Sequence, residues 1–149
     1  MTADPIPPGF VPISRTGPFL DLFGPVYTKD EGSSTIVAVR VGDKHLNTLG
    51  IAHGGMLVTL ADSALGINLS RALDVPRPMV TVNLSTDFLQ PARRGDWLEA
   101  HVQVQRVGVH LAFASCHLKV GDRLILRASG VFAIIGPEVP LPAREDFDG

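Results

Sequence analysis

The residues of this sequence that are best suited to take part in a reaction lie in one stretch that ends at Asp62. Asp62 is the only charged residue between Lys44 and Arg71, within the most apolar part of the chain. A carboxylate is costly to bury there unless it is paired or hydrogen-bonded, and such costs are tolerated mainly at functional sites. A mid-helix aspartate is also often a solvated surface residue. By itself, therefore, Asp62 fits either a catalytic carboxylate or a surface residue.

His53, Gly54 and Gly55 lie upstream of Asp62, at the start of the same apolar stretch. Glycines adopt backbone geometries that are closed to other residues. At a helix start, free N–H groups and the helix dipole favour negative charge. The Gly54 N–H could therefore hold a developing oxyanion, with the Asn47 amide as a second donor. A simpler interpretation also stays open: His53 caps a turn, Asn47 begins one, and the glycines allow tight packing.

One helix over about residues 55–73 is expected to position these groups, and Pro76 and Pro78 close it. On a helical wheel, apolar side chains cover about three fifths of the circle. The remaining residues are small, and Asp62 is the only charged one among them. We therefore expect the helix to be covered on most sides, with Asp62 beside a crevice. This polar strip consists of Thr59, Asp62, Ser63, Gly66 and Ser70.

The rest of the chain reads mainly as strands. The run over 97–107 alternates apolar and polar residues, which is typical of a half-buried strand in an antiparallel sheet. One long helix segregated from a group of strands predicts an α+β fold. A helical turn is expected at 18–23, after an irregular arm over 1–18, and the tail over 137–149 is expected to be flexible. Strands are expected at about 25–29, 34–42, 79–89, 97–107, 110–120 and 123–135.

Length and composition limit the function classes. The 149 residues suffice for a single domain, which we expect to span 1–149. Thirteen basic against fifteen acidic residues leave no positive excess for nucleic acid. The single cysteine, Cys116, excludes an intramolecular disulfide, and the five histidines lack metal-ligand spacing, so no metal is expected. No targeting or membrane-spanning segment is visible, so we expect a cytoplasmic protein with no membrane partner.

The segment HLNTLGIAHGGMLVTLADSALG resembles the signature of hotdog-fold acyl-CoA thioesterases. The match is best with the phenylacetate-pathway (PaaI-type) branch of the 4-hydroxybenzoyl-CoA thioesterase superfamily. Asn47 lies six positions before His53, and Asp62 lies nine positions after it. The later segment PMVTVNLSTDFLQPARRGD is similar to the family's next strand and turn. The resemblance covers roughly residues 19–135.

This resemblance implies a five- or six-stranded antiparallel sheet curled around the long helix. It also implies that subunits join sheet edge to sheet edge as dimers, which usually pair again as tetramers. The implied activity is hydrolysis of an acyl-CoA, with no cofactor beyond the CoA of the substrate. Gly54 and Asp62 would lie about 12 Å apart on one helix, too far to share a thioester carbonyl. A shared site would therefore take them from different subunits.

The family motif also implies a role for each candidate residue. Asp62 would be the nucleophile or the general base, and the Gly54 N–H would polarise the carbonyl with help from Asn47. His53 would orient Asn47 or line the site, and Thr81 would help to hold the attacking water beside Asp62. Strand alternation, however, places Thr81 on a polar face that could simply be solvated, together with Asn83, Ser85 and Asp87.

The substrate's CoA part needs basic partners for its phosphates. Arg93 and Arg94, in the turn after Pro91, are the first candidates, and Arg77, Arg106 and Arg127 are further ones. Scattered solubilising charge is the alternative for each of them. Gly55 also matches the motif. Two roles are open for it: binding of the substrate, or a backbone conformation that only glycine allows. Two rival functions stay open: an acyl-thioester hydratase or dehydratase, whose family branches typically use a histidine base, and a non-catalytic acyl-CoA-binding module, which needs no buried carboxylate.

Overall fold

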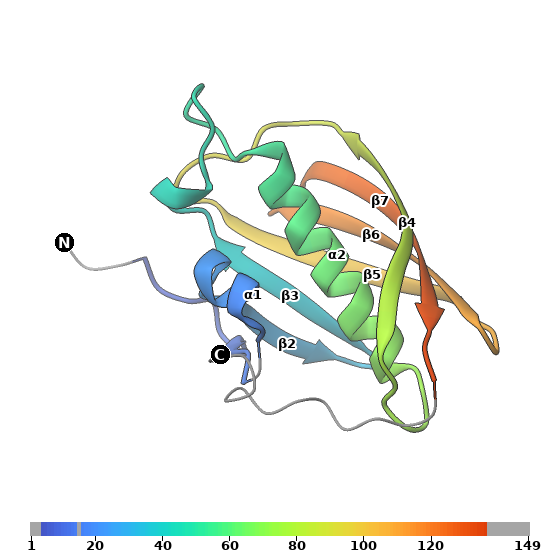
Figure 1. Ribbon diagram of the computed structural model, residues 1–149. Coiled ribbons are helices and arrows are strands. Elements are labelled where there is room, and N and C mark those ends of the chain that lie inside the picture. Colours follow the sequence, from blue (N-terminus) through green and yellow to red (C-terminus); the bar gives the residue numbers. More distant parts are fainter. Residues whose placement is uncertain (1–3, 15, 137–149) are drawn as a thin grey trace.

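A seven-stranded sheet and one long helix make up most of the structure, a computed structural model that describes residues 4–14 and 16–136. The strand order is β1-β2-β3-β5-β6-β7-β4, and every neighbouring pair is antiparallel. Helix α2 (Gly54–Arg71) lies across one face of the sheet (Figure 1). The strands are β1 Val11–Pro12, β2 Tyr27–Glu31, β3 Ser34–Arg40, β4 Met79–Phe88, β5 Trp97–Val107, β6 Leu111–Val120 and β7 Arg123–Ile134.

The predicted α+β class is confirmed, and six strands lie where the sequence predicts them. The sheet has a seventh strand because Val11–Pro12, inside the predicted irregular arm, pairs with the free edge of β2. Two residues are too few to carry a periodic pattern, so the partner strand alone defines β1. The predicted helical turn is α1 (Pro18–Phe23), and its first residue, Pro18, suits that position. The tail predicted over 137–149 lies outside the described residues.

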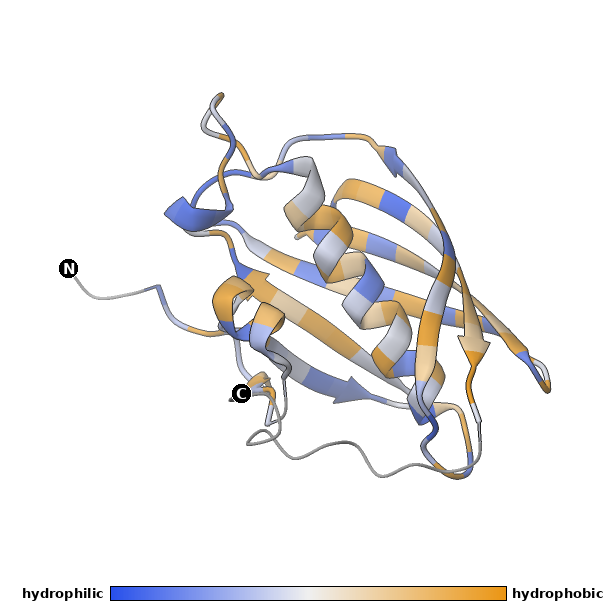
Figure 2. Ribbon diagram, viewed as in Figure 1, coloured by the Kyte–Doolittle hydropathy of each residue, from blue (hydrophilic) through white to orange (hydrophobic). Residues whose placement is uncertain are grey.

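Helix α2 is fixed along its length by apolar packing against the sheet. Leu60, Leu65 and Leu69 are fully buried within one apolar core that also includes residues of β3, β5, β6 and β7. Burial of each such side chain stabilises the fold by about 1.5–3 kcal/mol. Figure 2 shows the contrast between β3, which is largely hydrophobic, and β2, which is largely hydrophilic. The polar strip of α2 is half-buried along its length.

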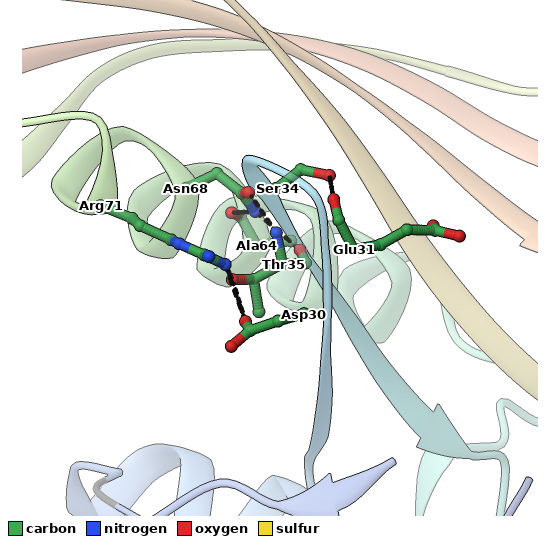
Figure 3. A network of polar contacts seen from close by, with 7 residues as sticks. All are labelled: Asp30, Glu31, Ser34, Thr35, Ala64, Asn68 and Arg71. Carbon is green, nitrogen blue, oxygen red and sulfur yellow. Dashed lines mark hydrogen bonds and ion pairs between the residues drawn. The ribbon is translucent and has the colours of Figure 1, made fainter. Parts of the chain in front are cut away.

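The buried amide of Asn68 ties the C-terminal half of α2 to the start of β3 (Figure 3). Its Oδ1 accepts the Thr35 N–H at 2.9 Å. Its Nδ2 donates to the carbonyl oxygens of Thr35 and Ala64, each at 2.9 Å. Asp30 then accepts the Thr35 hydroxyl and pairs with Arg71 at 2.7 Å. The Asn68 side chain thus bonds to the backbone of β3 as a neighbouring strand would. It fixes where α2 crosses the sheet.

Candidate active site

Asp62 and Thr81 make the central polar contact of the candidate site. Asp62 lies half-buried in the middle of α2, and Thr81 lies near the start of β4, at one edge of the sheet. The Thr81 hydroxyl donates to Asp62 Oδ1 at 2.6 Å, a length typical of a strong bond to a carboxylate. No other hydrogen bond to this carboxylate is made within the described residues. Oδ2 therefore keeps its capacity to accept a hydrogen bond, and the Thr81 oxygen can still accept a bond from water.

A β-bulge in β4 turns Thr81 toward the helix. The register of β4 against β7 shifts between Thr81 and Asn83, which makes Val82 the extra residue. An extra residue reverses the alternation of side chains along a strand. The prediction that Thr81 shares a face with Asn83, Ser85 and Asp87 is therefore wrong, because those side chains lie on the opposite face of the sheet.

The first turn of α2 presents a backbone donor. His53 caps the helix, and its Nδ1 accepts the Gly55 N–H at 2.8 Å, which confirms the simpler interpretation of His53 as a cap. The Gly54 N–H makes no hydrogen bond within the described residues. It is left as a donor at the positive end of the helix dipole. A Cβ at Gly54 would lie 3.2 Å from Cε1 of Phe88, a neighbour that sequence reasoning missed.

The contacts of Gly55 in the structure are those of the helix cap. Its N–H is already bonded to His53. A Cβ at Gly55 would lie 3.1 Å from His53 Nδ1, so a side chain there would push the histidine out of its capping position. Of the two predicted roles for Gly55, the conformational one accounts for these contacts.

Asn47 opens the loop that leads to His53. Its Oδ1 accepts the N–H groups of Leu49 and Ile51 at 2.9 and 3.3 Å, which is the turn-forming role expected of asparagine. The carbonyl end of the amide is thereby fixed, and Nδ2 is left as a donor. No hydrogen bond joins Asn47 to His53 within the described residues. His53 therefore does not orient Asn47 in this structure, and its second predicted role, lining the site, stays a prediction.

Arg93 and Arg94 lie in the turn that passes beside this loop. The backbone of Arg93 forms an isolated bridge with Ile51. Both arginines are exposed, and Arg94 pairs with Asp43 at 2.6 Å. The Arg93 guanidinium makes no ion pair with any described residue. Arg93 is therefore the better placed of the two to meet an anionic group near the 47–53 loop.

A cavity of about 480 Å³ opens between α1, the first turns of α2 and the short helix η1 (Asp43–His45). Small-molecule sites typically measure 300–1,000 Å³. Its polar lining consists of Lys44 and His45 of η1, the cap residue His53, and Gly55 and Thr59 of α2. Sequence reasoning missed this cavity because its walls come from separate segments. Its apolar lining consists of Phe19, Leu22, Phe23, Leu46 and Met56.

Two side chains of η1 hold α1 in place beside this cavity. His45 is buried, its Nδ1 accepts the Gly42 N–H at 2.9 Å, and its Nε2 contacts the Phe23 carbonyl oxygen at 2.6 Å. With Nδ1 as acceptor, the ring proton lies on Nε2, which donates to Phe23. The Lys44 ammonium donates to the Gly24 carbonyl oxygen. These bonds fix the C-terminal end of α1 against the turn that precedes the candidate site.

Other chemistry finds little support in the part of the chain that the structure describes. Burial raises the pKa of the Cys116 thiol from 9.0 to about 12, which keeps this cysteine protonated and unreactive. Among the described residues, no three histidine, cysteine, aspartate or glutamate side chains gather as a metal site would require. None of the helices over these same ranges has the length and hydropathy of a membrane span.

The chain matches the family model of the Thioesterase superfamily over residues 49–126. It is 48% identical over 128 residues to a presumed esterase of Pseudomonas aeruginosa, with 85% of this chain and 96% of that protein covered. The chain therefore belongs to the thioesterase superfamily. It is also 32% identical over 83 residues to acyl-coenzyme A thioesterase 13 of mouse, which covers 56% of this chain and 59% of the mouse protein.

A solved structure identifies which fold this arrangement of helix and sheet is. The PaaI protein of the phenylacetic acid degradation operon of E. coli superposes with a TM-score of 0.68 at 25% identity. The match covers 77% of this chain and 81% of the PaaI chain. A single long helix packed across an antiparallel sheet is thus the hotdog fold, and the predicted resemblance to PaaI-type thioesterases is confirmed.

Proposed function

We propose that this chain hydrolyses acyl-CoA thioesters to a free carboxylic acid and CoA. The observation that carries the proposal is the Thr81–Asp62 hydrogen bond, which orients a half-buried carboxylate through Oδ1 and leaves Oδ2 without a donor among the described residues. Membership of the thioesterase superfamily and the likeness to a named acyl-CoA thioesterase support a thioester as the substrate. A module that only binds acyl-CoA would have no use for an oriented carboxylate.

The complete site takes residues from two subunits. Gly54 and Asp62 are separated by about 12 Å along α2, so one carbonyl meets Gly54 of one copy and Asp62 of another. The edge strand β4 supports this arrangement, since Val80 and Val82 are 49% and 58% exposed there. Long apolar edges are usually covered. Pairing of two β4 strands would bring a second copy beside Asp62 and Thr81.

The reaction follows one of two routes. In the first, Asp62 removes a proton from water while the water oxygen attacks the carbonyl carbon. The oxyanion is held by the Gly54 N–H and Asn47 Nδ2. The C–S bond then breaks, and the proton passes from Asp62 to the CoA sulfur. In the second route, an Asp62 oxygen attacks, CoA leaves as the thiolate, and water hydrolyses the resulting anhydride. Thr81 serves both routes by holding the carboxylate in place.

Substrate binding draws on the positive charges beside the 47–53 loop. Phosphates bind well to guanidinium groups, which can make two parallel hydrogen bonds. Arg93 is free to make such bonds, whereas Arg94 must first exchange its contact with Asp43. Arg93 is therefore the principal CoA contact of this proposal, and Arg94 is a secondary one.

The proposal is tested by free-thiol release from a panel of acyl-CoAs. Removal of the carboxylate in Asp62→Ala lowers kcat by about 10²–10⁴-fold, the usual contribution of acid–base catalysis. Asp87→Ala is the matched control, because Asp87 is exposed on the outer face of the sheet and pairs with Arg127. Full activity of Asp62→Ala would refute the assigned site. A wild-type chain that releases no thiol from any acyl-CoA would refute hydrolysis itself.

A further inference from the structure

We infer that the cavity between α1 and α2 receives the acyl group of the thioester, and that Phe19 and Leu22 select bulky apolar acyl groups. The assignment of a thioester as the ligand rests on the proposed function. The shared chemistry of the preferred ligands is an apolar body several carbons long, either an alkyl chain or an aromatic ring.

The two faces of α1 carry this inference. Leu20 and Phe23 pack against the core, as expected for a helix that is bound to the sheet. Phe19 and Leu22 are 66% and 77% exposed, yet they lie three residues apart on one face of α1. Large apolar side chains gathered on an exposed face mark a binding surface. Both side chains line the cavity rather than a flat part of the surface.

The cavity lies beside the same first turn of α2 as the candidate oxyanion donor, which points to the acyl group as its occupant. Its polar lining comes from His53, Gly55 and Thr59 at the start of α2 and from Lys44 and His45 of η1. The free Gly54 N–H belongs to the same turn, so a carbonyl bonded to it lies next to two residues that line the cavity, His53 and Gly55. Arg93 is not among the cavity's lining residues. Lys44 does line the cavity, but its ammonium already donates to the Gly24 carbonyl oxygen. The charge proposed for CoA, on Arg93, therefore lies outside the apolar walls.

The size of the cavity decides between small and bulky acyl groups. An acetyl group has a single methyl group beyond its carbonyl and leaves most of the 480 Å³ unfilled. Each additional methylene that is buried against apolar walls gains about 0.8 kcal/mol, or roughly fourfold in affinity. Three such methylenes give a preference of about 50-fold over acetyl by the same arithmetic.

The test measures the affinity of acetyl-CoA, octanoyl-CoA and phenylacetyl-CoA by calorimetry, in an Asp62→Asn background that limits turnover. We expect octanoyl-CoA, phenylacetyl-CoA or both to bind about 50-fold more tightly than acetyl-CoA. The double variant Phe19→Ser/Leu22→Ser, whose two sites are exposed, should reduce this preference about tenfold. The matched control is Val75→Ser/Val109→Ser, which alters residues that are 43% and 77% exposed and lie outside the cavity lining. It should retain the preference.

Each outcome bears on the inference by itself. Equal affinity for the three thioesters would overturn it. It would also be overturned if the Phe19→Ser/Leu22→Ser chain kept its preference but changed its mass in light scattering, because α1 would then cover a second copy. Since affinity is the readout, a wild-type chain without hydrolytic activity refutes the proposed function but leaves the acyl pocket measurable. The octanoyl and phenylacetyl arms separate a linear from an aromatic preference.

Discussion

The hydroxyl of Thr81 donates to Asp62 Oδ1 at 2.6 Å and so joins the edge strand β4 to the middle of helix α2. The bulge at Val82 allows this contact, because without it Thr81 would face away from the helix. The orientation of the carboxylate therefore depends on the local geometry of an edge strand. Pairing of that edge with another subunit would act on the same residues.

Loss of the Thr81 hydroxyl should lower activity without unfolding the chain. Thr81→Val keeps the shape of the side chain but leaves Asp62 without its donor, and we expect kcat for thiol release to fall about tenfold, a modest value for one positioning contact. Thr81→Ser should recover most of this loss. Ser85→Val, on the opposite face of β4, is the control. Wild-type kcat in Thr81→Val would show that the hydroxyl has no part in positioning Asp62.

The capping role of His53 can be separated from a chemical one. His53→Ala removes the bond to the Gly55 N–H, and loss of a helix cap typically lowers the free energy of unfolding by about 1 kcal/mol. Asparagine is a good capping residue, so His53→Asn should restore both stability in urea and kcat. A His53→Asn chain that is stable but inactive would contradict the assignment and indicate that the imidazole takes part in the reaction.

Removal of the Asn68 amide should lower the free energy of unfolding more than any other single change in the polar contacts of α2. Asn68→Ala leaves the backbone N–H and carbonyl oxygen of Thr35 without this partner. We expect the free energy of unfolding to fall by about 2–4 kcal/mol, since each buried unpaired group costs about 1–3 kcal/mol. Ser63→Ala should change it by less than about 0.5 kcal/mol, because the one bond of the Ser63 hydroxyl to a described residue lies within its own helix, to Thr59. Equal urea midpoints for the two variants would refute this role of Asn68.

Burial of Cys116 makes stability depend on pH in the alkaline range. The folded chain keeps the thiol protonated because burial raises its pKa from 9.0 to about 12, whereas the unfolded chain loses the proton near its ordinary pKa. The free energy of unfolding should therefore fall as the pH rises from about 9 to about 12. Cys116→Ala should lose this part of the pH dependence in urea titrations. Identical alkaline slopes for the two chains would contradict the account.

Periodic features of the fold could be predicted from the sequence, and local exceptions could not. The helix around Asp62 and the six longer strands carry their period in the residues themselves. The bulge at Val82 leaves no mark on the alternation, so the sequence places Thr81 on the wrong face, although the family motif brings it to Asp62. The Asn68–Thr35 contact joins positions 33 residues apart, and strand β1 depends wholly on its partner. Such features are set by packing between segments, which one sequence does not display.

The central claim, a hydrolytic site divided between two subunits, is tested by co-expression of Asp62→Ala and Asn47→Ala chains. Each variant alone should be nearly inactive, since one oxyanion donor is worth about 10²–10³-fold and the carboxylate at least as much. Random pairing makes about half of the dimers hybrid, each with one intact site, so thiol release should return to about a quarter of the wild-type rate. Activity no higher than the mean of the two variants would show that each site is built within a single chain.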